Sequence, residues 1–224
     1  MFKKLSEKII IVSTLAFTCG TFIMPQVMTQ AFAAPIEFRQ DSGYAMQWAK
    51  QNYGNWRFSL GSEEVKAADY YTQGGFMVLN EKLRTDANVS ATSDIGKNIS
   101  YISAALNKMP IPEDIVVYRG TGENALGTLQ DLLQTKQGRE QLVGKVLVEK
   151  GFMSTSILRN KAFAKDIIFY LTVPQGTKGA YVGIGSVHDE REILLDKGYK
   201  YRINYIDVEP DTKKWRIYAE IVGQ

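Results

Sequence analysis

The sequence predicts an α+β domain in which a mostly antiparallel β-sandwich follows a group of N-terminal helices. Two observations lead to this fold class. Apolar residues recur at helical spacing up to Pro110, whereas short runs typical of strands take over after Pro112. Turns separate these runs instead of regular helices of about 10–15 residues, which argues against a doubly wound parallel sheet.

Four helical segments are expected before Pro110. The clearest begins after a cap at Ser93 or Asp94 and ends before Pro110, because proline cannot continue a helix. Spacings of four, three, four and three join the members of its apolar face, which are Ile95, Ile99, Ile102, Leu106 and Met109. Weaker helical patterns cover 43–53, 63–71 and 76–84.

Seven strand-like segments are expected after Pro112, with one polar helix over 123–134 between the first two. Their β-branched and aromatic content is typical of strands, and turn residues stand between them. The predicted strands cover 114–120, 145–151, 166–174, 179–185, 192–198, 199–209 and 213–223.

Residues 1–33 have the pattern of a cleaved secretory signal, which leaves 34–224 as a single domain. Three lysines precede an apolar run over 9–17, and the small residues Ala31 and Ala33 mark the expected cleavage site after Ala33. A retained membrane anchor is the weaker alternative. Polar residues, glycine and proline interrupt the apolar run before it reaches the roughly 20 residues that span a bilayer.

Composition excludes several classes of function. Residues 1–33 hold three of the 27 basic and one of the 24 acidic residues, so 34–224 carry 24 basic and 23 acidic residues, a net charge of +1. This balance gives no support for binding a polyanion, and nucleic acid is not expected as a partner. The same part has no cysteine and one histidine, His188, which excludes a disulfide framework, thiolate catalysis and a histidine-rich metal site.

Polar side chains that could carry chemistry stand at three strand ends: Arg119, the Ser-Thr-Ser run at 154–156, and the pair Glu190 and Glu192. Each motif alone has a structural explanation. The arginine could satisfy carbonyl groups at a strand end, the hydroxyls could pair across strands, and the glutamates could protect a sheet edge from pairing. Together they offer a planar fork for phosphate, a hydroxyl that orients a carboxylate, and a carboxylate that stabilises a cation. Cleavage of the ribose–nicotinamide bond of NAD, which forms an oxocarbenium-like cation, requires these groups.

In order and spacing the three motifs resemble the arginine, Ser-Thr-Ser, Glu-x-Glu class of bacterial ADP-ribosyltransferase toxins. The chain is similar in size to the clostridial Rho-modifying exoenzymes and in its Glu-x-Glu motif to the actin-modifying enzymatic components of binary toxins. The resemblance spans 71–223. It implies the ADP-ribosyltransferase fold and a secreted toxin that uses NAD as substrate, without a metal, to ADP-ribosylate a host protein and release nicotinamide.

The resemblance assigns a role to each motif. Arg119 is similar to the arginine that holds the NAD phosphate, and Ser154 is similar to the serine that positions the catalytic glutamate, with the next two residues supporting the strand. Glu192 resembles that glutamate, which grips the nicotinamide ribose and stabilises the cation. Glu190 resembles the residue that engages the acceptor side chain.

Two further segments match the family. Asn80 and Arg84 resemble helix residues that contact NAD; an exposed polar pair at i, i+4 is the alternative. Phe163 resembles the aromatic that stacks on nicotinamide, with a core side chain as the alternative. The phosphate-binding arginine expected after it is missing, so Lys165 or Arg159 would take that contact.

The identity of residue 190 predicts the acceptor. In this class a glutamate at that position accompanies modification of arginine, often in actin, whereas a glutamine accompanies modification of asparagine in Rho proteins. Glu190 therefore points to arginine, because a carboxylate can orient a guanidinium bidentately. The size of the domain keeps a Rho-type GTPase beside actin as a candidate target, and 181–189 would face the protein acceptor.

Three other functions remain open. The chain could be an NAD glycohydrolase with water as acceptor, an asparagine-directed Rho-modifying transferase, or a secreted binding module that keeps only the fold. As a toxin it would be secreted and act in the host cytosol, without stable membrane insertion. Nothing in the sequence resembles a pore-forming domain, so entry would need a separate translocation partner, nonspecific uptake or another route.

Overall fold

The computed structural model describes residues 33–86, 88–183 and 190–224, of which 34–224 form one compact unit. The predicted signal segment 1–33, apart from its last residue, lies outside the described residues, as does His188. The α-helices are α1 (Ser42–Tyr53), α2 (Ser62–Tyr70), α3 (Phe76–Thr85), α4 (Asp94–Leu106) and α5 (Lys136–Leu142). Short helical turns are η1 (Arg57–Ser59), the π-helical η2 (Tyr71–Gly75), η3 (Glu123–Gln134) and η4 (Arg159–Lys161).

The strands are β1 (Ile36–Glu37), β2 (Ile115–Thr121), β3 (Val146–Val148), β4 (Met153–Ser156), β5 (Ile167–Val173), β6 (Gly179–Tyr181), β7 (Glu192–Leu195), β8 (Lys200–Val208) and β9 (Trp215–Gly223). They form one sheet in the order β3-β8-β9-β5-β2-β4-β7-β6, and β1 pairs with β2 beside this path. The β1–β2 and β5–β9 pairs are parallel and the other pairs are antiparallel. The predicted α+β class with a mostly antiparallel sheet and N-terminal helices is confirmed.

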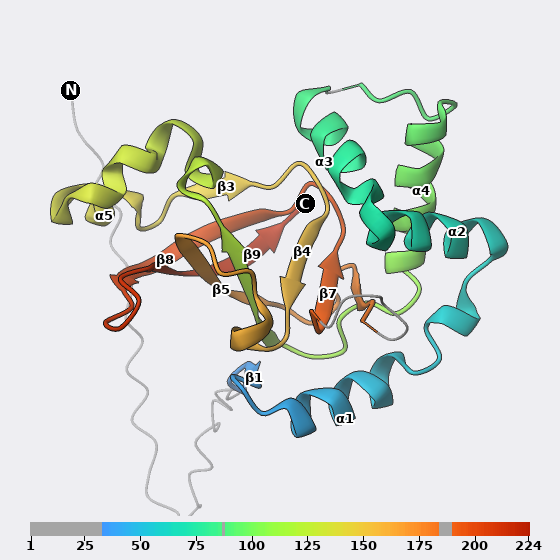
Figure 1. Ribbon diagram of the computed structural model, residues 1–224, viewed down its shortest axis with the longest axis horizontal. Coiled ribbons are helices and arrows are strands. Elements are labelled where there is room, and N and C mark those ends of the chain that lie inside the picture. The colour runs from blue at the N-terminus through green and yellow to red at the C-terminus, as the bar shows by residue number, and fades with distance from the viewer. Residues whose placement is uncertain (1–32, 87, 184–189) are drawn as a thin grey trace, which may run out of the picture. The chain divides into compact units, whose positions relative to one another are not determined.

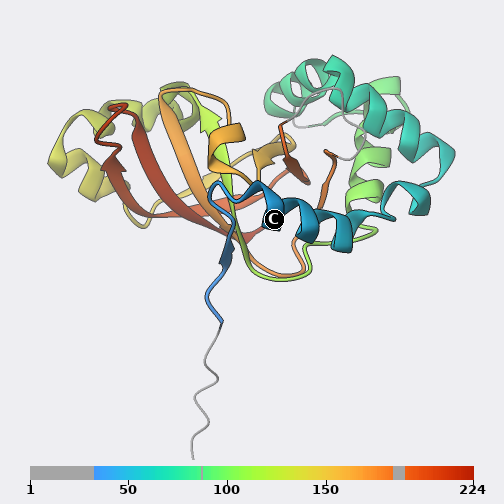
Figure 2. The same ribbon diagram turned by 60° about the horizontal axis from the view of Figure 1, so that its bottom comes forward.

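Helix α4 is the best-predicted element. The Ser93 hydroxyl accepts a hydrogen bond from the Gly96 amide at 3.0 Å, as expected of a cap. Ile99, Ile102 and Leu106 of its apolar face are at most 5% exposed. Figures 1 and 2 show α2, α3 and α4 grouped at one end of the sheet, with η3 and α5 at the other end.

The region between β2 and β3 differs from the prediction. Over 123–134 the chain forms 3₁₀ turns rather than a regular helix, and Gly127 inside them has a φ of 57°. Helix α5, capped by the Thr135 hydroxyl, follows and was not predicted, because its sequence is mostly polar. Leu126, Leu133 and Leu142 from this region are buried in the core.

No helix among the described residues is long and apolar enough to cross a bilayer.

Candidate functional site

Strand β2 lies in the interior of the sheet and carries Arg119 towards its end. Nη1 of Arg119 donates to the carbonyl oxygen of Ser154 in the neighbouring strand β4 at 2.8 Å, and Nη2 donates to Oε2 of Glu149 at 3.0 Å. The side chain is 21% exposed. Arg119 therefore joins two strands and a carboxylate while part of its side chain stays accessible.

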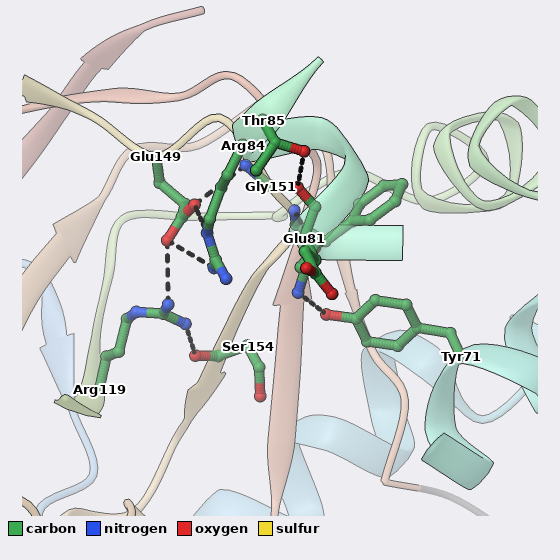
Figure 3. A network of polar contacts seen from close by, with 10 residues as sticks. Tyr71, Glu81, Arg84, Thr85, Arg119, Glu149, Gly151 and Ser154 are labelled. Atoms are coloured by element: carbon green, nitrogen blue, oxygen red, sulfur yellow. Dashed lines mark hydrogen bonds and ion pairs between the residues drawn. The ribbon is translucent and has the colours of Figure 1, made fainter. Parts of the chain in front are cut away.

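Glu149 is shared by two arginines, as Figure 3 shows. Its carboxylate accepts hydrogen bonds from Nε and Nη2 of Arg84 at 2.9 and 3.1 Å, from Arg119, and from the Gly151 amide at 2.9 Å. Burial by itself would raise the pKa of Glu149, but the hydrogen bonds and charges of the two arginines outweigh it and hold the pKa below its usual value. Glu149 is therefore an ionised carboxylate that fixes the spacing of Arg84 and Arg119.

Asn80 connects α3 to the segment that leads into β4. Its Oδ1 accepts from the Phe152 amide at 2.8 Å, and its Nδ2 donates to the Tyr71 hydroxyl at 3.1 Å. A Cβ on Gly151 would lie 2.7 Å from Oδ1 of Asn80, so the glycine allows this close approach. Both ends of the amide are thus engaged with the protein, and Asn80 is buried rather than an exposed polar side chain.

The Ser-Thr-Ser run forms part of β4 and pairs with β7. Ser156 is opposite Glu192 in the antiparallel register. The Thr155 hydroxyl donates to the Ile193 carbonyl at 2.7 Å, and Ser156 Oγ accepts from the Leu158 amide at 3.1 Å. The hydroxyl groups of Thr155 and Ser156 therefore stabilise the backbone of β7 and of the segment after β4.

Glu192 is the first residue of β7 and is only 7% exposed. Its pKa is raised to about 7, chiefly by burial and also by the charge of Glu190, whereas a hydrogen bond from the Ser154 side chain and the charge of Arg119 act in the opposite direction. A carboxyl group that changes charge near neutral pH is suited to respond to a cation placed beside it.

Glu190 reaches the same pocket without belonging to the strand. Arg191 stands between the two glutamates with a φ of 50°, in the left-handed region that few residues other than glycine adopt. Its carbonyl accepts from the Ile157 amide at 3.0 Å, and its Nη1 contacts Met46 Sδ of α1 at 2.8 Å. The backbone turns at Arg191, so strand alternation alone does not explain the common direction of the two carboxylates.

A pocket of about 520 Å³ brings seven of the predicted site residues together. The sequence-predicted residues in its lining are Asn80, Arg84, Arg119, Ser154, Phe163, Glu190 and Glu192. A second pocket of about 560 Å³ adjoins it, because Arg84 and Arg119 line both.

Phe163 lies over the end of β2. A Cβ on Gly120 would overlap the Phe163 carbonyl, so the glycine after Arg119 lets this loop rest directly on the strand. The Phe163 side chain is 51% exposed, which rules out a core role. Neither candidate for the phosphate contact lines the pocket: Arg159 is held by Tyr170 and Glu209, and Lys165 lies outside the lining. Lys161 lines the pocket instead.

A model of the ADP-ribosyltransferase exoenzyme family matches residues 45–223. The chain belongs to this family. Mono-ADP-ribosyltransferase C3 of Clostridium botulinum C phage is 26% identical to it over 190 residues, which cover 79% of this chain and 77% of that protein. NAD(+)--arginine ADP-ribosyltransferase EFV of Enterococcus faecalis is 28% identical over 154 residues, 68% of this chain and 31% of that protein.

Solved structures agree with this assignment. BECa, an ADP-ribosylating toxin of a binary enterotoxin of C. perfringens, was solved with NADH. Its structure matches with a TM-score of 0.73 and 32% identity over 84% of this chain. This chain spans half the length of the BECa chain. The predicted ADP-ribosyltransferase fold, the toxin family and NAD as the family's substrate are confirmed.

The pocket of this exoenzyme contains both signs of charge. Arg84 and Arg119 are planar hydrogen-bond donors in its lining, and Glu190 and Glu192 are carboxylates in the same lining. Among the described residues, no group of three or more His, Cys, Asp or Glu side chains could hold a metal ion.

Sequence reasoning missed several residues at the site, among them Glu149, Tyr71 and Lys161. Glu149 joins Arg119 and Arg84 across 30 and 65 positions of sequence, and a single sequence carries no signal for such a contact. Burial and the charge of Glu192 raise the pKa of Tyr71, which keeps its hydroxyl neutral. Tyr71 could have been suspected only from its place in the segment that precedes Asn80.

Proposed function

We propose that this exoenzyme is secreted and transfers ADP-ribose from NAD to an arginine side chain of a host protein, releasing nicotinamide. The observation that carries this proposal is the presence of Glu190 and Glu192 in one pocket with Arg84 and Arg119.

The first step breaks the bond between ribose C1′ and the nicotinamide nitrogen. Its electron pair leaves with nicotinamide, and an oxocarbenium-like cation remains on the sugar. Glu192, positioned by Ser154, provides the negative charge opposite that cation. The positive charge of bound nicotinamide favours the ionised carboxylate, which offsets the effect of burial on its pKa.

The arginines hold the other part of the substrate. Glu149 presents Arg84 and Arg119 at a fixed spacing, and both can receive the pyrophosphate through planar, charge-assisted hydrogen bonds. Asn80 fixes α3, which carries Arg84, against the approach to β4. The exposed ring of Phe163 offers a face on which nicotinamide can stack.

Glu190 selects the acceptor. A carboxylate can orient a protonated guanidinium through two parallel hydrogen bonds, and it can accept the proton that the guanidinium loses when its nitrogen bonds to C1′. A neutral amide acceptor would gain less from a second carboxylate. Actin and Rho-type GTPases are the two host proteins to test first. The similarity to a toxin from a binary enterotoxin also supports a search for a separate translocation partner.

Two variants separate the parts of this proposal. Glu192→Gln keeps the shape of the side chain but removes its charge, so NAD cleavage and protein transfer should both fall by about a hundredfold or more while NAD still binds. Unchanged turnover would contradict the assignment of Glu192.

Glu190→Gln should nearly abolish transfer to arginine and leave NAD hydrolysis intact, since Glu192 alone faces the sugar cation. Mass spectrometry of the labelled host protein decides the acceptor. ADP-ribose on asparagine would indicate the asparagine-directed reaction. Release of nicotinamide without protein label would indicate a glycohydrolase, and no NAD turnover would indicate a binding module.

A further inference from the structure

Three large apolar side chains stand exposed at the mouth of the pocket. Met77 is 64% exposed, Phe163 51% and Phe76 42%, although all three line the pocket. We call these three residues the apolar rim. Phe76 and Met77 begin α3, whereas Phe163 follows η4, so the rim borders the pocket with residues from two segments far apart in the sequence.

The backbone is shaped to present both parts of the rim. Before Phe76 the π-helical turn η2 contains Gly74 with a φ of 118°, a conformation that side-chain-bearing residues rarely adopt. Below Phe163 the missing Cβ of Gly120 lets the loop lie against β2. Both positions favour glycine. Gly74 comes shortly before the exposed Phe76, and Gly120 lies against the segment that carries the exposed Phe163.

With Glu149 counted beside its two arginines, carboxylates outnumber cations around the pocket by one. Glu81, Glu190 and Glu192 line the pocket, while the cationic Arg84 and Arg119 are already paired with Glu149. When NAD occupies the arginines, its pyrophosphate adds further negative charge. Lys161 also lines the pocket. A group that enters from solvent therefore meets apolar surface first and carboxylates behind it.

We propose that the apolar rim is a docking surface for the acceptor protein, and that this protein presents a cationic side chain surrounded by apolar residues. The inference rests on the proposed function and adds the chemistry of the acceptor surface to it. Exposed aromatic and methionine side chains are typical of interface centres, and methionine adapts its shape to its partner. The three rim residues line the same pocket as Glu190, so we expect an acceptor that delivers its side chain to Glu190 to contact the rim.

Met77 provides the test, because it is the most exposed rim residue and no NAD contact is assigned to it. Met77→Gln keeps the length and helix propensity of the side chain but removes its apolar end. Met77→Arg also places a like charge opposite the expected cation. The control is Phe58→Gln, which removes an 87% exposed aromatic that does not line the pocket.

Two activities are measured for each protein: nicotinamide release from NAD in buffer, and transfer of labelled ADP-ribose to proteins of a mammalian cell lysate. We expect Met77→Gln to lower the rate of protein transfer about tenfold and Met77→Arg to lower it further, with nicotinamide release within about twofold of the wild type. Phe58→Gln should change neither.

The other outcomes contradict the inference in distinguishable ways. A parallel loss of nicotinamide release would show that Met77 belongs to the NAD site. Unchanged protein transfer, or a wild-type enzyme that cleaves NAD and labels no protein, would show that the rim docks no acceptor. A wild-type protein that does not cleave NAD would instead contradict the proposed function itself.

Discussion

Glu190 and Glu192 line the same pocket although only Glu192 belongs to strand β7. The left-handed backbone of Arg191 separates them, and the charge of Glu190 contributes to the raised pKa of Glu192. The two carboxylates are therefore coupled electrostatically but differ in environment, since Glu192 is buried and Glu190 is partly exposed. Different environments give two carboxylates different chemical roles.

The pH dependence of NAD cleavage should reveal the buried carboxyl group. Burial raises the pKa of Glu192 to about 7, and the ionised form is the one that opposes the sugar cation. We expect kcat/KM for nicotinamide release to rise with pH through an inflection at about pH 7 and to level off at higher pH. In Glu190→Gln the neighbouring charge is gone, so the inflection should move to lower pH. A flat profile from about pH 5.5 to about pH 8.5 would show that ionisation of the buried carboxyl group does not control the rate of NAD cleavage.

The same burial means that ionised Glu192 should lower the free energy of unfolding. Its folded pKa of about 7 lies above the usual value of 4.5, so the folded protein binds this proton more tightly than the unfolded chain. The cost is absent well below pH 4.5 and complete above about pH 7, where it is at most on the order of 3 kcal/mol. Glu192→Gln should therefore raise the free energy of unfolding at pH 8 and not at pH 4, measured by urea denaturation. Equal effects at both values would argue against a neutral buried carboxyl group at low pH.

Local patterns predicted the fold and the site where the signal lies within a few residues. The periodic apolar face fixed α4, and Arg119, Ser154 and Glu192 could be found because each belongs to a short motif beside a strand. Helix α5 was missed because it is only seven residues long, contains a glycine, and has no apolar face at helical spacing.

Contacts between distant segments could not be predicted. Arg159 is the next arginine after the Ser-Thr-Ser run, but Tyr170 and Glu209 hold it outside the pocket. Glu149 falls in the predicted strand 145–151 and belongs to none of the motifs, and only the folded chain shows that it binds two arginines. In both cases the partner lies in another element, and the tertiary arrangement decides which contact is made.

Arg119 should not tolerate lysine. Its planar guanidinium reaches the Ser154 carbonyl and Glu149 with two different nitrogens, and a single ammonium group cannot reproduce that geometry. Arg119→Lys is expected to lower kcat/KM for NAD cleavage by about a hundredfold, chiefly through a higher KM. Arg202→Lys is the matched control, since Arg202 pairs with Glu220 on exposed strand positions away from the pocket. Equal activity of the two variants would contradict the role of the two-nitrogen geometry.

Gly120 should also be sensitive to substitution, although it has no side chain. A Cβ there would overlap the Phe163 carbonyl, so Gly120→Ala must push the loop away from β2 and move the Phe163 ring from the pocket wall. We expect the KM for NAD to rise about tenfold or more, and calorimetry should show weaker NAD binding. Gly43→Ala is the control, because a Cβ at Gly43 has only an ordinary contact, with Asp41, and an alanine in helix α1 should stabilise the fold by about 0.5–1 kcal/mol. If Gly120→Ala bound and cleaved NAD as well as Gly43→Ala does, the close contact between β2 and the Phe163 loop would have no part in forming the site.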